Sequence, residues 1–154
     1  KSGDGLRMAD AADVRELLGS YDIIVGEEWV KAWPNEALLM HDVGADAAAY
    51  GRELILDAMK EYQPEYVEAF HAMSAGQGFF RCNMFFARKF VFDAYCDWLF
   101  SFLLPAVEHM DAGKLHGKER RVLGFWGERM LTVWLLRQNL RIKELPFLEL
   151  PHGG

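Results

Sequence analysis

The sequence predicts an α/β domain in which a small sheet of short strands packs with several long helices. Apolar residues recur at helical spacing over several long stretches, and β-rich runs such as residues 21–25 and 79–86 lie between them. The chain has 154 residues, of which 51% are hydrophobic, and a chain of this length buries about 70% of its unfolded surface. We therefore expect residues 1–154 to form a single domain.

The first half of the chain combines helices with one strand. Apolar spacing predicts a helix over Met8–Leu18, and a buried strand follows at Tyr21–Val25. Residues 26–45 show no sustained period, so we expect a long loop there. Helical periodicity returns over Ala47–Glu61, and a further helix begins at Pro64 and continues to about Met73, because proline is tolerated at a helix start.

A strand expected at Phe79–Phe86 carries two polar side chains. Alternation along a strand puts Arg81 and Asn83 on one face with Phe79 and Phe85. Two interpretations stay open. The strand lies at a sheet edge and its polar residues meet water, or it lines the ligand cleft at the end of an α/β sheet.

The remaining elements are two long helices and a final strand. The first helix covers Arg88–His109, and Pro105 should kink or end it near Leu104. After a polar loop at 108–117, we expect a helix at Lys118–Asn139 and a strand at Glu144–Leu150, which Pro146 restricts to a sheet edge.

The last helix is apolar on nearly all sides, which predicts deep burial. Arg121, Gly124, Glu128 and Thr132 nevertheless follow the spacing i, i+3, i+7, i+11 and share one face. A glycine inside a helix costs roughly 1 kcal/mol relative to alanine, so Gly124 and Gly127 make room either for a ligand or for a neighbouring backbone.

Glu128 is the candidate acid or base on this face. The competing interpretation is a surface ion pair with Arg121 or Arg129. A metal site is not predicted, because His41, His109, Asp111 and His116 do not match a chelating spacing.

Composition disfavours several kinds of partner. The chain has 17 Lys and Arg against 23 Asp and Glu, a net charge of −6 without a basic run, so we expect no nucleic-acid partner. Asp93 and Asp97 interrupt the longest apolar stretch, so we predict no transmembrane segment. Cys82 and Cys96 match neither a disulfide framework nor a zinc spacing, and reduced thiols favour a cytoplasmic location.

A series of motifs runs through the chain in a fixed order: Tyr21-Asp22-Ile23-Ile24-Val25, Pro64-Glu65-Tyr66, Asn83-Met84-Phe85, Tyr95-Cys96-x-Trp98-Leu99-Phe100, Gly124-Phe125-x-x-Glu128-Arg129 and Glu144-Leu145-Pro146. The series resembles the C-terminal two thirds of a bacterial family of capsular and exopolysaccharide biosynthesis glycosyltransferases. The resemblance covers about residues 21–150. It implies a GT-A-like fold.

The resemblance also implies an activity. It is transfer of a hexosyl group, such as galactofuranosyl, from a UDP-sugar to a growing capsule or exopolysaccharide chain. The UDP-sugar is a substrate, and no covalently bound cofactor is implied. The transfer would take place in the cytoplasm at the inner face of the membrane, with peripheral membrane contact.

Site residues follow from the same resemblance. It implies Glu128 as the catalytic base and Asn83, Arg81, Arg121 and Arg129 as substrate-binding residues. The family's His-Tyr-Arg-Arg segment and its N-terminal nucleotide-binding half are absent from this sequence. We therefore expect a fragment that lacks this half.

The rival interpretation is a non-catalytic binding or assembly module, in which an aromatic-rich surface docks a partner chain. A free strand edge at Asp22–Val25 would favour it, because an unpaired edge invites pairing.

Overall fold

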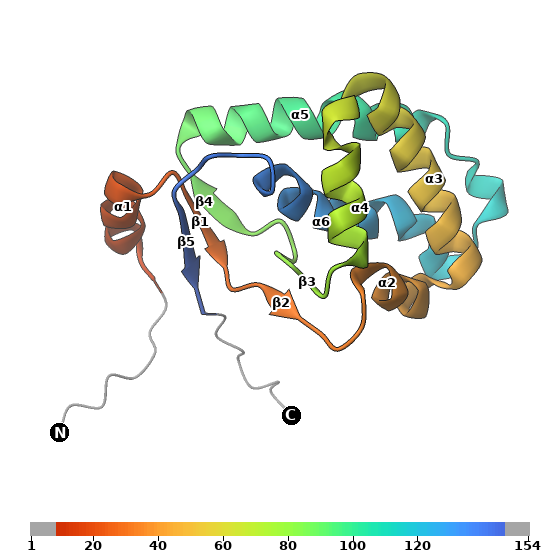
Figure 1. Ribbon diagram of the computed structural model, residues 1–154, viewed down its shortest axis with the longest axis horizontal. Coiled ribbons are helices and arrows are strands. Elements are labelled where there is room, and N and C mark those ends of the chain that lie inside the picture. Colours follow the sequence, from red (N-terminus) through yellow and green to blue (C-terminus); the bar gives the residue numbers. More distant parts are fainter. Residues whose placement is uncertain (1–8, 147–154) are drawn as a thin grey trace.

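The computed structural model describes residues 9–146, with the main sheet toward one end of the molecule and most of the helices toward the other (Figure 1). Over these residues the helices are α1 (Ala11–Ser20), α2 (Asn35–Val43), α3 (Ala45–Tyr62), α4 (Val67–Ala75), α5 (Lys89–Glu108) and α6 (Val122–Leu135). The strands are β1 (Ile23–Gly26), β2 (Trp29–Val30), β3 (Gly78–Phe79), β4 (Phe85–Ala87) and β5 (Ile142–Leu145), and 3₁₀ turns lie at η1 (Pro64–Tyr66), η2 (Ala112–Lys114) and η3 (Gly117–Arg121). The predicted α/β class is confirmed.

The main sheet has the strand order β4-β1-β5. Strand β1 runs antiparallel to β4 and parallel to β5, with Ile24 opposite both Phe86 and Lys143. Asp22–Val25 therefore has no free edge to favour the assembly-module interpretation, because β4 and β5 pair with the two sides of β1 from distant parts of the chain. Since β1 and β5 are parallel, their carboxyl ends at Gly26 and Leu145 lie at the same end of the sheet.

The last two predicted elements, a helix and the final strand, differ from the structure by a few residues at their ends. The final strand spans Ile142–Leu145 and lies at the sheet edge, as Pro146 predicted, while residues 147–150 of the expected strand lie outside the described residues. The expected helix at Lys118–Asn139 divides into η3 and the shorter α6.

The segment 26–45 is not the loop that the missing periodicity predicted. It contains β2 and α2, neither of which has a strong local signal, since β2 has two residues and the N-cap residue of α2, Pro34, provides no side-chain cap. Tertiary contacts hold α2 instead. The buried Asn35 donates from Nδ2 to the carbonyls of Met73 and Gly78, at 2.8 Å each, and its own N–H donates to Gly76 O at 2.8 Å.

The predicted strand Phe79–Phe86 is also wrong, because two residues interrupt it. Cys82 and Asn83 both have positive φ, at 66° and 48°, which turns the chain. Phe79 consequently belongs to β3 in the small β2-β3 sheet, and Phe85 belongs to β4 in the main sheet. Arg81 and Asn83 therefore do not share the face of one strand.

Helix α5 continues past the point where Pro105 was expected to end it. It reaches Glu108, because the buried Ala106 packs in the core and the His109 N–H donates to the Pro105 carbonyl at 3.1 Å. By length and apolar composition α5 meets the requirements of a membrane span, a test that core helices of soluble proteins also pass. Several large side chains of α5 stay exposed: Phe90, Phe92, Phe100, Leu104 and Val107.

Helix α6 is the central element of the core, as its apolar residues predicted. Most of its side chains are buried, and the fully buried Trp126 donates from Nε1 to the Ala48 carbonyl at 3.1 Å and packs on Phe70 at 5.2 Å between ring centroids. Gly51 of α3 lets the two helices approach, since a Cβ there would lie 2.7 Å from Val122 Cγ2. The tight α3–α6 contact fixes the position of α6.

Asp22 joins the amino ends of β1 and β5. Its carboxylate accepts hydrogen bonds from the Arg141 backbone N–H at 2.9 Å, from Nε at 3.1 Å and from Nη2 at 2.8 Å. Arg88, which precedes α5, donates its backbone N–H to the Asp22 carbonyl at 3.2 Å and its guanidinium to the Leu18 carbonyl at the end of α1 at 2.8 and 3.1 Å. These bonds join β1, β5, α1 and the start of α5.

Acid should weaken this junction in a defined range of pH. The hydrogen bonds from Arg141 lower the pKa of Asp22 from 3.8 to about 2. A lowered pKa stabilises the folded state above the unfolded value, and this contribution is lost as pH falls through the folded value. We expect the difference in unfolding free energy between wild type and Asp22→Asn to shrink as pH falls from about 4 to about 2.

Urea denaturation at a series of pH values measures this difference. Asp57→Asn is the control, because it removes a carboxylate that pairs with Lys60 on the surface. A difference for Asp22→Asn that stays constant between pH 5 and pH 2 would contradict the role of Asp22.

Candidate functional site

The predicted polar face of α6 leaves the core at the amino-terminal half of the helix. Arg121 and Gly124 are exposed, Glu128 is half-buried, and Thr132 is 6% exposed. Thr132 is covered by the residue after β3, since the Phe80 N–H donates to Thr132 Oγ1 at 2.9 Å. We call Arg121, Gly124 and Glu128 the open face of α6.

Glu128 does not form the surface ion pair that was the competing interpretation. Within residues 9–146 no ion pair joins it to Arg121 or Arg129. Arg121 instead lies over the Phe125 ring, with 5.2 Å between its guanidinium carbon and the ring centroid. Among residues 9–146, the Glu128 carboxylate at the open face therefore has no ion-pair partner.

Arg129 faces the interior. It is 2% exposed, donates from Nη1 to the Phe125 carbonyl at 2.7 Å and lies 4.4 Å over the Phe79 ring. Burial lowers its pKa, and the negative charges of Glu128 and Asp42 oppose that shift. In this position Arg129 joins β3 to α6, and Phe79 separates it from solvent on that side.

The surroundings of Gly124 and Gly127 show whether each glycine makes room for a ligand or for a neighbouring part of the chain. A Cβ on Gly127 would meet Leu103 Cδ2 at an ordinary 3.8 Å, so Gly127 packs beside α5. A Cβ on Gly124 would meet nothing within 4 Å. No described backbone occupies the space beside Gly124, so the space is open to a ligand or to another chain.

Asn83 brings the turn at residues 81–84 to the same region. Its Nδ2 donates to the Gly127 carbonyl at 3.4 Å, one residue before Glu128, and its Oδ1 accepts from the Tyr95 hydroxyl at 3.1 Å. The Arg81 side chain instead contacts Trp29, with its guanidinium carbon 5.4 Å from the centroid of the Trp29 ring. Of the two polar residues in the expected strand, Asn83 contacts α6 at Gly127, next to Glu128 in sequence, and Arg81 contacts Trp29 of the small sheet.

A cavity of about 440 Å³ opens at the carboxyl ends of β1 and β5. Its walls come from the strand ends and from the turn, and they carry no charged side chain: Ile24, Val25, Gly26, Asn83, Met84, Phe85, Phe86, Leu145 and Pro146. Asn83 belongs both to this wall and to the contact with α6. The candidate site thus consists of the open face of α6 and this cavity, joined by the turn at 81–84.

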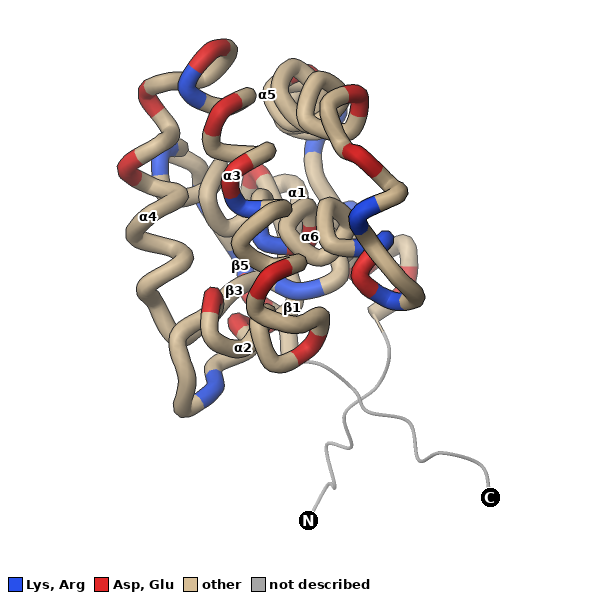
Figure 2. Tube along the Cα trace, turned by 90° about the vertical axis from the view of Figure 1, so that its right-hand side faces the viewer, with Lys and Arg blue, Asp and Glu red and all other residues tan. Residues whose placement is uncertain are grey.

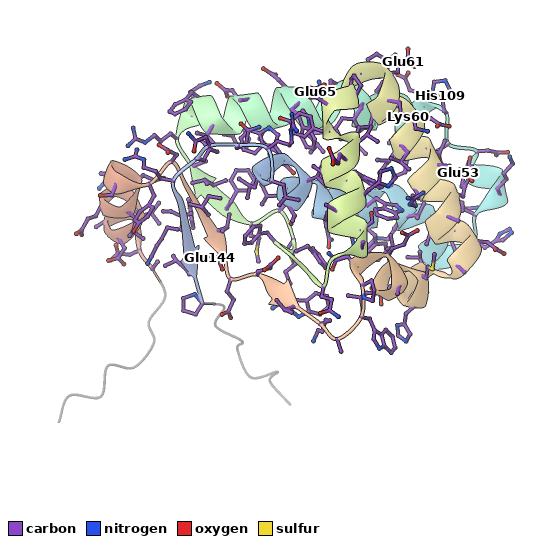
Figure 3. The ribbon with its side chains drawn as sticks, viewed as in Figure 1. Glu53, Lys60, Glu61, Glu65, His109 and Glu144 are labelled. Carbon is purple, nitrogen blue, oxygen red and sulfur yellow. The ribbon has the colours of Figure 1, made fainter. Side chains whose placement is uncertain are left out.

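A smaller cavity of about 210 Å³ lies elsewhere, between α3 and the end of α5. Asp57, Glu61, Tyr62 and His109 contribute to its lining, and Figure 3 shows Glu61 and His109 at the helical end of the molecule, away from Glu144 on β5. Acidic residues recur along α3 in Figure 2. Even so, no group of three or more metal-binding side chains assembles within the described part of the chain.

Sequence reasoning missed Tyr95 and the turn. Tyr95 enters the sequence analysis only as part of a motif, and its hydroxyl contact with Asn83 spans 12 residues, which no periodicity reveals. A usable signal was present in Asn83, because asparagine tolerates positive φ better than most residues.

Residues 4–139 match the family model described as Domain of unknown function (DUF4422). The chain belongs to the DUF4422 family.

The DUF4422 chain also resembles a solved structure, that of the bifunctional glycosyltransferase WbbM in its apo form. The TM-score is 0.74 and the sequence identity 21%, and the match covers 89% of this chain and 25% of the WbbM chain. At this identity the likeness establishes a shared fold. The DUF4422 chain spans about a quarter of the length of WbbM, and no curated protein matches it.

The open face predicts opposite effects of two alanine substitutions in the DUF4422 chain. Gly124→Ala should raise the free energy of unfolding by about 1 kcal/mol, because alanine favours a helix and the added methyl group meets open space. Gly51→Ala should lower it, because its Cβ would lie 2.7 Å from Val122 Cγ2. Chemical denaturation measures both. A loss of stability in Gly124→Ala would show that the space is filled.

Proposed function

We propose that this chain forms the acceptor side of a glycosyltransferase that uses a nucleotide sugar, with Glu128 as the catalytic base. The observation that carries the proposal is the Glu128 carboxylate, half-buried at the open face of α6 without an ion-pair partner in residues 9–146, beside the unfilled space at Gly124. The fold shared with WbbM supports the same reaction class by analogy.

The reaction requires a base at this position. Glu128 would accept the proton of an acceptor hydroxyl while the hydroxyl oxygen attacks the anomeric carbon of the donor. The bond from that carbon to the phosphate oxygen breaks, and the nucleoside diphosphate leaves with the electron pair. Attack opposite the leaving group inverts the anomeric configuration.

The charge of the leaving diphosphate needs cations. Arg121 is exposed on the open face and is the described arginine best placed to help, whereas Arg129 is buried under Phe79. The cavity at the strand ends has an uncharged wall, so it suits a neutral part of a substrate better than a diphosphate. Much of the diphosphate site would therefore come from outside these residues, in keeping with a match to a quarter of WbbM.

We infer a UDP-hexose donor, such as a galactofuranosyl donor, and a growing capsule or exopolysaccharide chain as acceptor, which the motif resemblance supports. The same resemblance supports action in the cytoplasm at the inner face of the membrane.

The rival function, a non-catalytic assembly module, is favoured by a different observation. Five large apolar side chains of α5 are exposed: Phe90, Phe92, Phe100, Leu104 and Val107. Large exposed apolar patches often mark a surface that binds another protein. Transfer activity by the complete protein that depends on Glu128 separates the two functions.

Removing the base should abolish turnover without unfolding the protein. Glu128→Gln keeps the size of the side chain, and loss of a general base typically lowers turnover by about 10²–10⁴-fold. The assay measures sugar transfer by the complete protein from a panel of UDP-hexoses. Glu53→Gln, which removes an exposed carboxylate of α3, is the control (Figure 3). Near wild-type transfer by Glu128→Gln would remove Glu128 from the mechanism.

The open space at Gly124 gives a second test. Gly124→Ala should make the fold more stable and the transferase less active, because its methyl group enters the space proposed for the acceptor. Steady-state kinetics with varied acceptor should show a raised KM. An unchanged acceptor KM would place the acceptor elsewhere.

A further inference from the structure

We infer that Tyr95 is a positioning residue, which acts through Asn83 to hold the turn at 81–84 beside Glu128. We call the two hydrogen bonds of Asn83, to Tyr95 and to Gly127, the clamp. The clamp is a property of the fold, whereas its effect on sugar transfer rests on the proposed function.

The clamp links two helices through one amide. Tyr95 belongs to α5, and its hydroxyl donates to Asn83 Oδ1 at 3.1 Å. The Asn83 Nδ2 donates in turn to the Gly127 carbonyl of α6 at 3.4 Å. Both polar atoms of the amide therefore bond to the protein, which gives Asn83 a positioning role in the exposed turn.

The tyrosine ring has little freedom to move. It is 3% exposed and lies against Phe85, Trp134 and Trp98, with centroid separations of 5.5, 5.3 and 6.1 Å. Burial raises the pKa of the Tyr95 hydroxyl, so it remains protonated and able to donate at neutral pH.

The turn needs such a clamp because its backbone is strained. Cys82 and Asn83 have positive φ, a left-handed conformation that disfavours ordinary side chains because it brings Cβ close to the following carbonyl oxygen. Asparagine tolerates the conformation, whereas cysteine gains nothing from it. A strained conformation persists only where its surroundings hold it.

Two anchors on α6 enclose Glu128. The turn contacts Gly127 through Asn83 at 3.4 Å, and the preceding Phe80 N–H contacts Thr132 at 2.9 Å, so Glu128 lies between the two contact positions in the sequence of α6. The other side of the same turn forms the cavity wall with Met84, Phe85 and Phe86. Releasing the clamp would therefore change the distance between the cavity and the Glu128 carboxylate.

Hydrogen exchange tests the clamp without any substrate. Tyr95→Phe removes the hydroxyl donor and keeps the ring, so exchange of the Phe80 amide, which donates to Thr132 Oγ1 at 2.9 Å beside the turn, should accelerate by up to about tenfold. Tyr66→Phe is the matched control, because the buried Tyr66 loses an equivalent hydroxyl contact, 2.8 Å from Gln138 Nε2, in another part of the core. Asn83→Ala should accelerate exchange as Tyr95→Phe does, and the double variant should add little.

Kinetics test the consequence for the reaction. In the complete protein, kcat/KM for the acceptor should fall about tenfold in Tyr95→Phe and in Asn83→Ala, while the KM for the nucleotide sugar and the values for Tyr66→Phe stay near wild type. Unchanged exchange of the Phe80 amide, or equal acceleration in Tyr66→Phe, would overturn the clamp. Faster exchange with unchanged acceptor kcat/KM would overturn the positioning role. Faster exchange in a protein whose wild type transfers no sugar would uphold the clamp and reject the proposed function.

Discussion

The carboxylate of Asp22 is the contact on which the arrangement of the sheet depends. It binds Arg141 through three hydrogen bonds and so aligns the amino ends of β1 and β5 as parallel neighbours. Arg88 ties the end of α1 and the start of α5 to the same point. Because one end of the sheet is fixed in this way, the carboxyl ends of both strands open together at the cavity. The position of the candidate site thus follows from a contact at the opposite end of the strands.

Helix α6 serves stability and the candidate site at once. Most of it is buried, and it even buries Arg129, whose charge is balanced by a carbonyl and an aromatic face rather than by a bound carboxylate. The same helix keeps Gly124 at a position where alanine would fit and would favour the helix. A helix that forgoes this stability beside a carboxylate without an ion-pair partner in residues 9–146 has the pattern of a functional surface, where local stability is often given up for a ligand.

Much of the fold could be predicted from the sequence, because the periodicity of α3, α5 and α6 reports burial directly. The face that Glu128 shares with Gly124 also followed from helical spacing, whereas the role of Glu128 as a base came from the resemblance and stays a proposal. The failures share one cause, which is tertiary contact between distant segments. Asn35 holds α2 through carbonyls about 40 residues away, and β1 becomes central only when β4 and β5 reach it. The Cys82–Asn83 turn broke the alternation that had placed Arg81 beside Asn83.

Mapping of backbone amide chemical shifts tests directly whether the acceptor binds at the open face of α6. A labelled sample of the complete protein would be titrated with a UDP-hexose and then with an acceptor oligosaccharide. We predict that the acceptor changes the amide chemical shifts of Arg121–Glu128 and of residues 81–84 together. Shifts confined to the cavity of Asp57, Glu61 and His109, with the open face of α6 unaffected, would contradict it.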